Sequence, residues 1–295
     1  MVDVLRCDTT LGVKLGGMKF FLATLCAFTW LIQSVEGHGR VIEPPARNVL
    51  WRFGYDAPQN FEDSELFCGG IKAQWQDNDG RCGVCGDNYS LKPPRRHETG
   101  REFARNFTVR TYAPGSQIEI VIDIVANHLG YFEFSLCPRN DSGVLETEEC
   151  FDSHPLPVFG KGMELSEGKS RYRLPTARKG LYLTQVQLPP DIVCEFCVLR
   201  WHWRSANNWG LCEDGKEAMG CGPQETYRNC VDIAVGHNHG IRGSLGANAK
   251  PRPKEFKFPK NKPYVAISNS VVDEKKQESS HYEAPDVHDW LLEHR

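Results

Sequence analysis

Cysteine is the residue that most constrains how this chain can fold. The 295 residues include 12 cysteines, a number that is typical of proteins folded in an oxidising compartment. Cys7 and Cys26 lie near the N-terminus, and the other ten lie between Cys68 and Cys230. This even number predicts five disulfides in the main part of the chain, although the sequence does not choose among the possible pairings.

The N-terminal segment has the pattern of a secretory signal peptide. Residues 20–33 form an apolar run that is too short to span a bilayer comfortably. The small residue Gly37 follows a few positions later and suits signal peptidase. We therefore expect 1–37 to be a signal peptide, with 1–17 as an upstream extension, and His38 to be the first residue of a secreted, extracellular protein. A buried N-terminal helix is the alternative.

Two further patterns depend on this compartment. The C-x-x-C spacing at 82–85 and 194–197 also resembles zinc half-sites, but outside the cell we expect disulfides instead. Glycan acceptor sequences begin at Asn88, Asn106 and Asn140, in agreement with secretion.

The segments between the cysteines predict an all-β protein. Short β-branched or alternating runs are separated by Gly, Pro and Asn clusters, without helical patterns between them. The expected strands are 107–112, 118–125, 131–136, 181–187, 197–204 and 231–235. We predict an immunoglobulin/fibronectin-like β-sandwich. Residues 38–100 should form long disulfide-pinned loops and short helices.

Charge and composition limit the domains and the partners. We expect a folded domain over 38–244 and a flexible polar tail over 245–295, where a basic proline-rich stretch precedes an acidic one. The net charge of −3 disfavours a nucleic-acid or anionic-membrane partner. We expect a monomer.

His38 points most directly to chemistry. A histidine at a new N-terminus offers a metal its α-amino nitrogen and a ring nitrogen, a chelate that no internal histidine can form. His128 follows the expected strand 118–125, where a loop would hold its side chain at the rim of the sandwich. Three nitrogens in a T favour Cu(II). By itself, His128 is more simply explained as a hydrogen-bonded loop histidine.

Glu225 and Tyr227 form a second candidate pair. They lie two residues apart on an expected strand, so their side chains share one face. A tyrosine suits an axial position beside a copper ion, and a glutamate nearby suits a hydrogen bond to an oxygen species. By itself, Tyr227 is more simply explained as a core aromatic.

Together and in this order, these residues resemble the lytic polysaccharide monooxygenases, most closely the invertebrate type classed as auxiliary activity family 15. The resemblance covers about residues 38–235. It rests on short stretches such as His38-Gly-Arg40, Leu50-Trp-Arg-Phe-Gly-Tyr55, Cys82-Gly-Val-Cys-Gly-Asp87, Ala126-Asn-His128 and Gln224-Glu-Thr-Tyr227.

The resemblance implies roles for single residues. His38 and His128 match the two histidines that bind copper in the family, the "histidine brace". Tyr227 matches the axial aromatic residue beside the copper. Ala126 matches the small residue whose methyl group crowds one axial face. Glu225 as a further polar residue of the catalytic site is our inference from spacing.

The resemblance also implies a reaction. One copper ion, cycling between Cu(II) and Cu(I), would use O2 or H2O2 and an external reductant to oxidise β-1,4-linked polysaccharide, with C1 as the expected position. Chitin is our first choice because relatives of this type are largely from invertebrates, and cellulose is the alternative. A crystalline substrate requires a flat, exposed site. Stacking on sugar or packing within the loops would explain the aromatics Trp51, Phe53, Tyr55 and Trp75.

Two other functions fit parts of the same sequence. A secreted copper-binding protein without catalysis could use the same histidines, and a carbohydrate- or cuticle-binding module would not need them. No pair of carboxylates stands out as a glycosidase signature. Copper titration distinguishes the carbohydrate- or cuticle-binding module from the other functions, because that module predicts no tight copper site.

Overall fold

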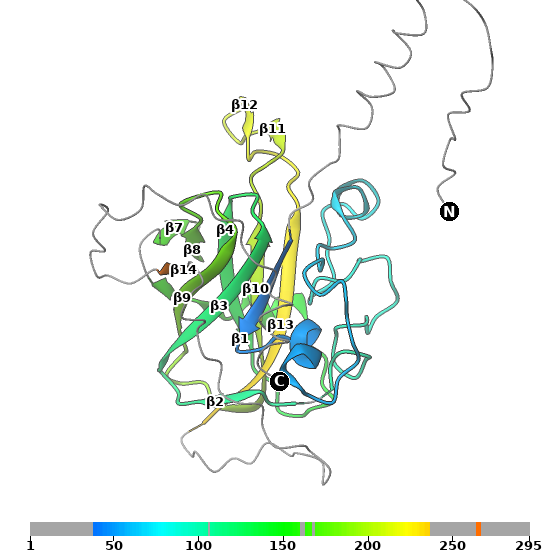
Figure 1. The fold of residues 1–295 in the computed structure, drawn as a ribbon, viewed down its shortest axis with the longest axis vertical. Coiled ribbons are helices and arrows are strands. Elements are labelled where there is room, and N and C mark those ends of the chain that lie inside the picture. Colours follow the sequence, from blue (N-terminus) through cyan, green and yellow to red (C-terminus); the bar gives the residue numbers. More distant parts are fainter. Residues whose placement is uncertain (1–37, 106, 160–162, 167–168, 237–263, 267–295) are drawn as a thin grey trace, which may run out of the picture. The chain divides into compact units, whose positions relative to one another are not determined.

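The computed structural model describes residues 38–105, 107–159, 163–166, 169–236 and 264–266 (Figure 1). The expected signal peptide, residues 1–37, lies outside these ranges and stays a prediction. None of the helices in the described ranges is long and apolar enough to cross a membrane.

Strands dominate the described residues and form two main sheets and a small hairpin. The five-stranded sheet has the order β1 (His38–Glu43), β3 (Gln117–Ala126), β9 (Gly180–Gln187), β14 (Tyr264–Ala266), with β6 (Val158–Phe159) on β9. The seven-stranded sheet has the order β2 (Arg110–Tyr112), β13 (Thr226–Val235), β10 (Cys194–Arg204), β4 (Tyr131–Cys137), β8 (Lys169–Arg173), β7 (Met163–Ser166), with β5 (Pro155–Leu156) on β4. Strands β11 (Trp209–Leu211) and β12 (Glu217–Met219) form the hairpin.

The core lies between the two main sheets. Strand β3 contributes the fully buried side chains of Ile120 and Ile122, which are β-branched and suit a strand. The opposing sheet contributes Phe132, which packs edge-on against Trp201 with 5.4 Å between the ring centroids. Buried residues of both sheets belong to one hydrophobic cluster. This arrangement confirms the expected all-β sandwich.

The first part of the chain contains more regular structure than the sequence predicts. The short helices expected within 38–100 are present as a 3₁₀ helix at Arg47–Phe53 and a π-helix at Lys72–Gln76. A short α-helix at Glu148–Asp152 lies outside that range and is not predicted by the sequence. The expectation of loops from residue 38 is wrong for β1, which pairs antiparallel with β3. Strand β1 is short and contains a glycine, so its alternation was too weak to detect.

The ten cysteines of the domain form five disulfides, as expected. The pairs are Cys68–Cys82, Cys85–Cys230, Cys137–Cys150, Cys194–Cys197 and Cys212–Cys221. Neither C-x-x-C motif is therefore a zinc half-site. The Cys85–Cys230 bridge joins the long N-terminal loops to β13 across a sequence separation of 145 residues.

A buried ion-pair network fixes the 3₁₀ helix against the sandwich. Arg47 donates to both carboxylate oxygens of Asp232, at 2.6 and 2.7 Å, and to Glu146 at 2.6 Å. Burial alone would lower the pKa of Arg47, but these two carboxylates outweigh burial and raise it. Arg139 lies 3.6 Å from Glu146 and 3.5 Å from Asp232, so two cations and two anions share one buried site.

Most of the expected C-terminal tail, 245–295, lies outside the described residues, and its flexibility stays a prediction. The exception is β14 at Tyr264–Ala266, which pairs parallel with β9. The run of prolines and charges around it gave no sign of a strand.

Candidate functional site

The residues singled out in the sequence lie at one end of the sandwich. His38 is the first residue of β1 and pairs with Ala126, the last residue of β3. His128 lies two residues beyond Ala126, so the strand register brings the two histidines to the same edge. Figure 1 shows that the β11–β12 hairpin projects from the end of the sandwich where β1 begins.

His38 has a ring nitrogen that lacks a hydrogen-bond partner. Its Nδ1 is buried and makes no hydrogen bond to any described residue. The nearest carboxylate oxygen, Oε1 of Glu65, is 3.9 Å away. A buried polar atom without a partner is rare in proteins and calls for an explanation such as an absent ion.

Close packing fixes the backbone that follows His38. Gly39 donates its N–H to the carbonyl of Ser64 at 3.0 Å. A Cβ atom at Gly39 would lie 2.9 Å from Ile124 Cδ1 and 3.2 Å from Trp201. A side chain at this position would require the Ile124 or Trp201 side chain to shift. Glycine therefore allows β1 to lie close to the tryptophan of the opposing sheet next to His38.

A tight turn holds His128. Gly130 has φ +85°, and a Cβ there would lie 2.0 Å from the carbonyl oxygen of Arg204. This position requires glycine on both counts. The carbonyl of His128 accepts a hydrogen bond from the N–H of Ala206 at 2.9 Å. The loop after β10 therefore helps to hold the His128 backbone.

Two polar side chains surround Nδ1 of His128. Oε2 of Glu225 lies 3.0 Å away, and Nδ2 of Asn207 lies 2.7 Å away. A carboxylate can only accept a hydrogen bond. The contact with Glu225 therefore requires the His128 tautomer whose proton is on Nδ1, so that Nδ1–H donates a hydrogen bond to Glu225. Turning the Asn207 amide over would place its oxygen there as a second acceptor. With Nδ1 protonated, Nε2 keeps the lone pair that a metal ion needs.

Tyr227 combines the two explanations weighed from the sequence. It is fully buried, and its ring stacks on Trp203 with 4.7 Å between centroids and lies 6.0 Å from Phe67. Its hydroxyl donates to Oε2 of Glu225 at 3.3 Å. Tyr227 is thus a core aromatic whose polar end reaches the carboxylate that holds His128.

The structure therefore brings together all five residues chosen from the sequence. The register joins His38 to Ala126, and side-chain contacts join His128, Glu225 and Tyr227. Two neighbours were not predicted. Glu65 and Asn207 lie in loops whose paths the sequence does not specify, and an acidic or amide side chain in a loop is common.

The four aromatics considered for sugar stacking are partly occupied by the protein. Phe53 and Tyr55 pack against the hydrophobic core. Trp75 donates its Nε1 to the carbonyl of Gln224 at 2.9 Å. Trp51 lies edge-on to Phe61, with 5.4 Å between centroids. Packing within the loops explains at least Phe53 and Tyr55.

The donor set at this end of the sandwich fits a copper ion. His38 contributes an unpartnered Nδ1, and signal-peptide removal would add an α-amino group to the same residue. His128 contributes Nε2, since Nδ1 is occupied by Glu225. Three nitrogen donors without thiolates suit Cu(II), which prefers tetragonal nitrogen coordination.

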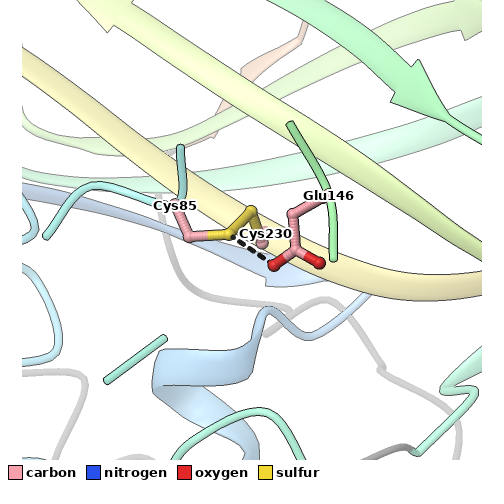
Figure 2. Close-up of side chains that lie close together, drawn as sticks. All are labelled: Cys85, Glu146 and Cys230. Atoms are coloured by element: carbon pink, nitrogen blue, oxygen red, sulfur yellow. Dashed lines mark hydrogen bonds between the residues drawn. A yellow bond between two sulfur atoms is a disulfide. The ribbon is translucent and has the colours of Figure 1, made fainter. Parts of the chain in front are cut away.

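A second cluster of potential ligands is structural. Cys85, Cys230 and Glu146 bring possible ligand atoms within 4.8 Å of one another. Figure 2 shows that the two sulfurs are joined in a disulfide, so neither supplies the thiolate that a metal would bind. Glu146 is already held by Arg47 and by the N–H of Thr99, at 2.6 and 3.0 Å.

Comparisons with known proteins address the family to which the chain belongs. A family model described as "Lytic polysaccharide mono-oxygenase, cellulose-degrading" matches residues 38–233. A structure of an AA15 lytic polysaccharide monooxygenase from Thermobia domestica, in the Cu(I) state, is 46% identical, with a TM-score of 0.63. The alignment covers 67% of this chain and 98% of that one.

More distant structures give weaker similarity. A chitin-binding domain from Burkholderia pseudomallei is 15% identical with a TM-score of 0.41, over 68% of this chain and 100% of that one. The fusolin of a Wiseana entomopoxvirus is 12% identical with a TM-score of 0.33, over 87% and 98%. A comparison with curated protein sequences finds no match.

Proposed function

Because the chain belongs to the lytic polysaccharide monooxygenases, in the type classed as auxiliary activity family 15, we propose that it is a secreted enzyme whose copper is held by His38 and His128. Family membership makes it a copper-dependent enzyme that oxidises polysaccharide. The substrate we propose is crystalline chitin, with cellulose as the alternative, oxidised at C1. O2 or H2O2 would be the cosubstrate, and an external reductant would supply electrons.

The observation that carries this proposal is the buried, unpartnered Nδ1 of His38 at the start of β1. The proposed second ligand, His128, follows Ala126, the register partner of His38, by two residues, and removal of 1–37 would add the third nitrogen on His38 itself. When bound, copper supplies the redox chemistry that activates the cosubstrate and allows a C–H bond beside the glycosidic link to be oxidised.

The remaining residues would set the surroundings of the metal. Ala126 lies directly opposite His38, and side chains paired in this way share one face of the sheet. Its methyl group would therefore crowd one side of the ion. Glu225 would fix the ring of His128, and the Tyr227 ring, held by Trp203, would line the site on the side of Glu225. Partners of this kind typically raise metal affinity by orienting the ligands.

Copper binding should weaken in acid. Both imidazoles and the α-amino group must be neutral to bind the metal. Copper therefore competes with protons for these three nitrogens, and its apparent affinity should fall as the pH is lowered.

The direct test uses mature protein with His38 as its first residue, loaded with copper. The protein is incubated with β-chitin and, separately, with cellulose, with ascorbate as the reductant, and soluble products are analysed by mass spectrometry. Oligosaccharides with the mass of an aldonic acid, absent after copper chelation, are the expected result and identify the substrate. Tight copper binding without oxidised products from either polymer would favour a non-catalytic copper protein.

A matched variant tests the role of the N-terminus. A protein that retains a single Met before His38 keeps every side chain but loses the free α-amino group at that residue. We expect it to lose tight copper binding and activity together. Normal chitin oxidation by this variant would contradict the proposed ligand set.

A further inference from the structure

The β11–β12 hairpin carries an apolar surface that is exposed among the residues the structure describes. Trp209, Leu211 and Met219 are 62%, 63% and 59% exposed. Trp209 pairs with Met219 across the hairpin, and Leu211 lies two residues after Trp209, so all three side chains share one face. Exposed apolar side chains that lie together on a rigid element commonly mark an interaction site.

The hairpin is held both internally and at its base. Within it, the Cys212–Cys221 disulfide joins the turn after β11 to the chain that follows β12. At the base, Gln224 both accepts from the N–H of Asn208, at 3.0 Å, and donates to its carbonyl, at 2.9 Å. A Cβ at Gly210 would lie 2.4 Å from the carbonyl oxygen of Cys221, so the covered face is closely packed. The exposed face is therefore held in place before any partner arrives.

The base of the hairpin is also part of the copper site. Asn207 contacts Nδ1 of His128 where the chain enters the hairpin, and Glu225 contacts the same atom where the chain leaves it. Trp209 follows Asn207 by two residues, which corresponds to about 7 Å of extended chain. The apolar face thus begins within two residues of a side chain that contacts His128 of the proposed copper site.

The charge of the hairpin restricts what it can bind. Glu213, Asp214 and Glu217 are exposed on or near its tip, and the one basic residue there, Lys216, lies 3.3 Å from Asp214. The acidic excess would repel nucleic acid or an anionic lipid surface. A neutral polymer with apolar faces meets no such barrier.

We propose that the hairpin is a sugar-binding platform on which Trp209 stacks against a pyranose ring of the polysaccharide. This inference rests on the proposed function. Rings joined by β-1,4 links carry their substituents equatorially, so each face of the ring presents C–H groups that suit an aromatic surface. Glu217 accepts a hydrogen bond from Trp209 Nε1 at 3.2 Å and orients the indole. Leu211 and Met219 extend the contact to neighbouring sugars.

The test measures binding separately from oxidation. Copper-loaded mature protein is mixed with β-chitin and with cellulose without reductant, and the protein left in solution is quantified. Trp209→Ala should weaken binding about tenfold, which corresponds to about 1.4 kcal/mol, and Trp209→Phe should retain most of it. Copper affinity should not change in either variant.

Val193→Ala is the matched control. Val193 is 60% exposed but precedes β10 at the end of that strand remote from Arg204 and His128. Its removal should leave polysaccharide binding unchanged. A proportional loss in both alanine variants would show a general effect of surface hydrophobicity and overturn the platform.

The remaining outcomes separate the two proposals. If wild-type protein oxidises a polysaccharide and Trp209→Ala binds it equally well, the platform is wrong while the proposed function stands. If wild-type protein binds copper but neither polymer, both fail. Sedimentation of both proteins addresses a different partner, because a dimer that Trp209→Ala abolishes without affecting polysaccharide binding would assign the face to a second copy of the chain.

Discussion

Replacing Arg47 by methionine should destabilise the domain severely, although the new side chain has nearly the same shape as the old one. Arg47 is 2% exposed and donates to Asp232 and Glu146 at 2.6–2.7 Å. Methionine has a similar length and no charge. The variant therefore leaves two buried carboxylates beside a single cation, Arg139.

The expected magnitude follows from this imbalance. Removing one member of a buried ion pair typically costs about 3–5 kcal/mol, because the remaining charge is buried without compensation. For a domain of this size, 1 kcal/mol lowers Tm by about 2–4 °C, so Tm should fall by about 6–20 °C. The exposed pair Arg96–Glu102 is the matched control, and Arg96→Met should cost less than about 1 kcal/mol.

The pH dependence gives a second, independent readout. Burial alone would raise the pKa of Glu146, but the charge of Arg47 and hydrogen bonds from Thr99 and Arg47 lower it below its ordinary value of 4.5. A lowered folded-state pKa means that the contribution is present above about pH 4.5 and is lost as the pH falls through the folded-state value. Without Arg47, burial dominates, so stability should begin to fall at a higher pH.

Thermal unfolding of both variants and the wild type, followed by circular dichroism from pH 3 to pH 8 with the disulfides intact, measures both effects. A loss below about 1 kcal/mol for Arg47→Met, or the same pH profile as the wild type, would refute the electrostatic argument. In that case, the buried ion pairs of Arg47 would contribute little to the stability of the domain.

Three further changes test the site itself. Gly130→Ala should lower the free energy of unfolding by at least about 2 kcal/mol and weaken copper binding, because the added Cβ would meet the carbonyl of Arg204. Thermal unfolding and copper titration measure these effects, and an unchanged Tm would contradict the turn geometry. Glu225→Ala should weaken copper binding about 10–100-fold, measured by chelator competition. Glu225→Gln should recover part of this affinity, because its amide oxygen can still accept a hydrogen bond from His128. An equal loss in both variants would indicate that the charge of Glu225 matters instead. Replacing Cys212 and Cys221 together by serine should loosen the hairpin. We expect weaker polysaccharide binding and faster proteolysis at the hairpin, with copper affinity retained. Unchanged polysaccharide binding would show that the platform does not depend on the rigidity of the hairpin.

The strands that the sequence predicts best are those with one clear pattern. The expected strand 118–125 corresponds to β3, and 131–136 corresponds to β4, each within one or two residues. Both combine aromatic or β-branched residues with a buried face. The sequence does not predict strand β1, because its partners in β3 are 78 or more residues away (Glu43 pairs with Val121) and its own six residues carry little alternation.

The site divides along the same line. The sequence singles out His38 and His128 because of their positions in the chain, at the expected cleavage point and after an expected strand. Glu65 and Asn207 could not, because each acts through a loop conformation that long-range contacts determine. The disulfide pairings were also inaccessible, since spacing alone does not specify which cysteines meet in space.

Strand β1 also determines when the N-terminus can be immobilised during synthesis. Its N–H group at Val41 donates to Asn229, which is 188 residues later in the chain, and Arg40 binds Asp123, 83 residues later. These partners leave the ribosome long after β1 itself, and contacts of such high sequence separation form late in folding. In the proposed mature protein, the segment that is made first is therefore fixed among the last, and His38 reaches its final position only when the whole domain is present.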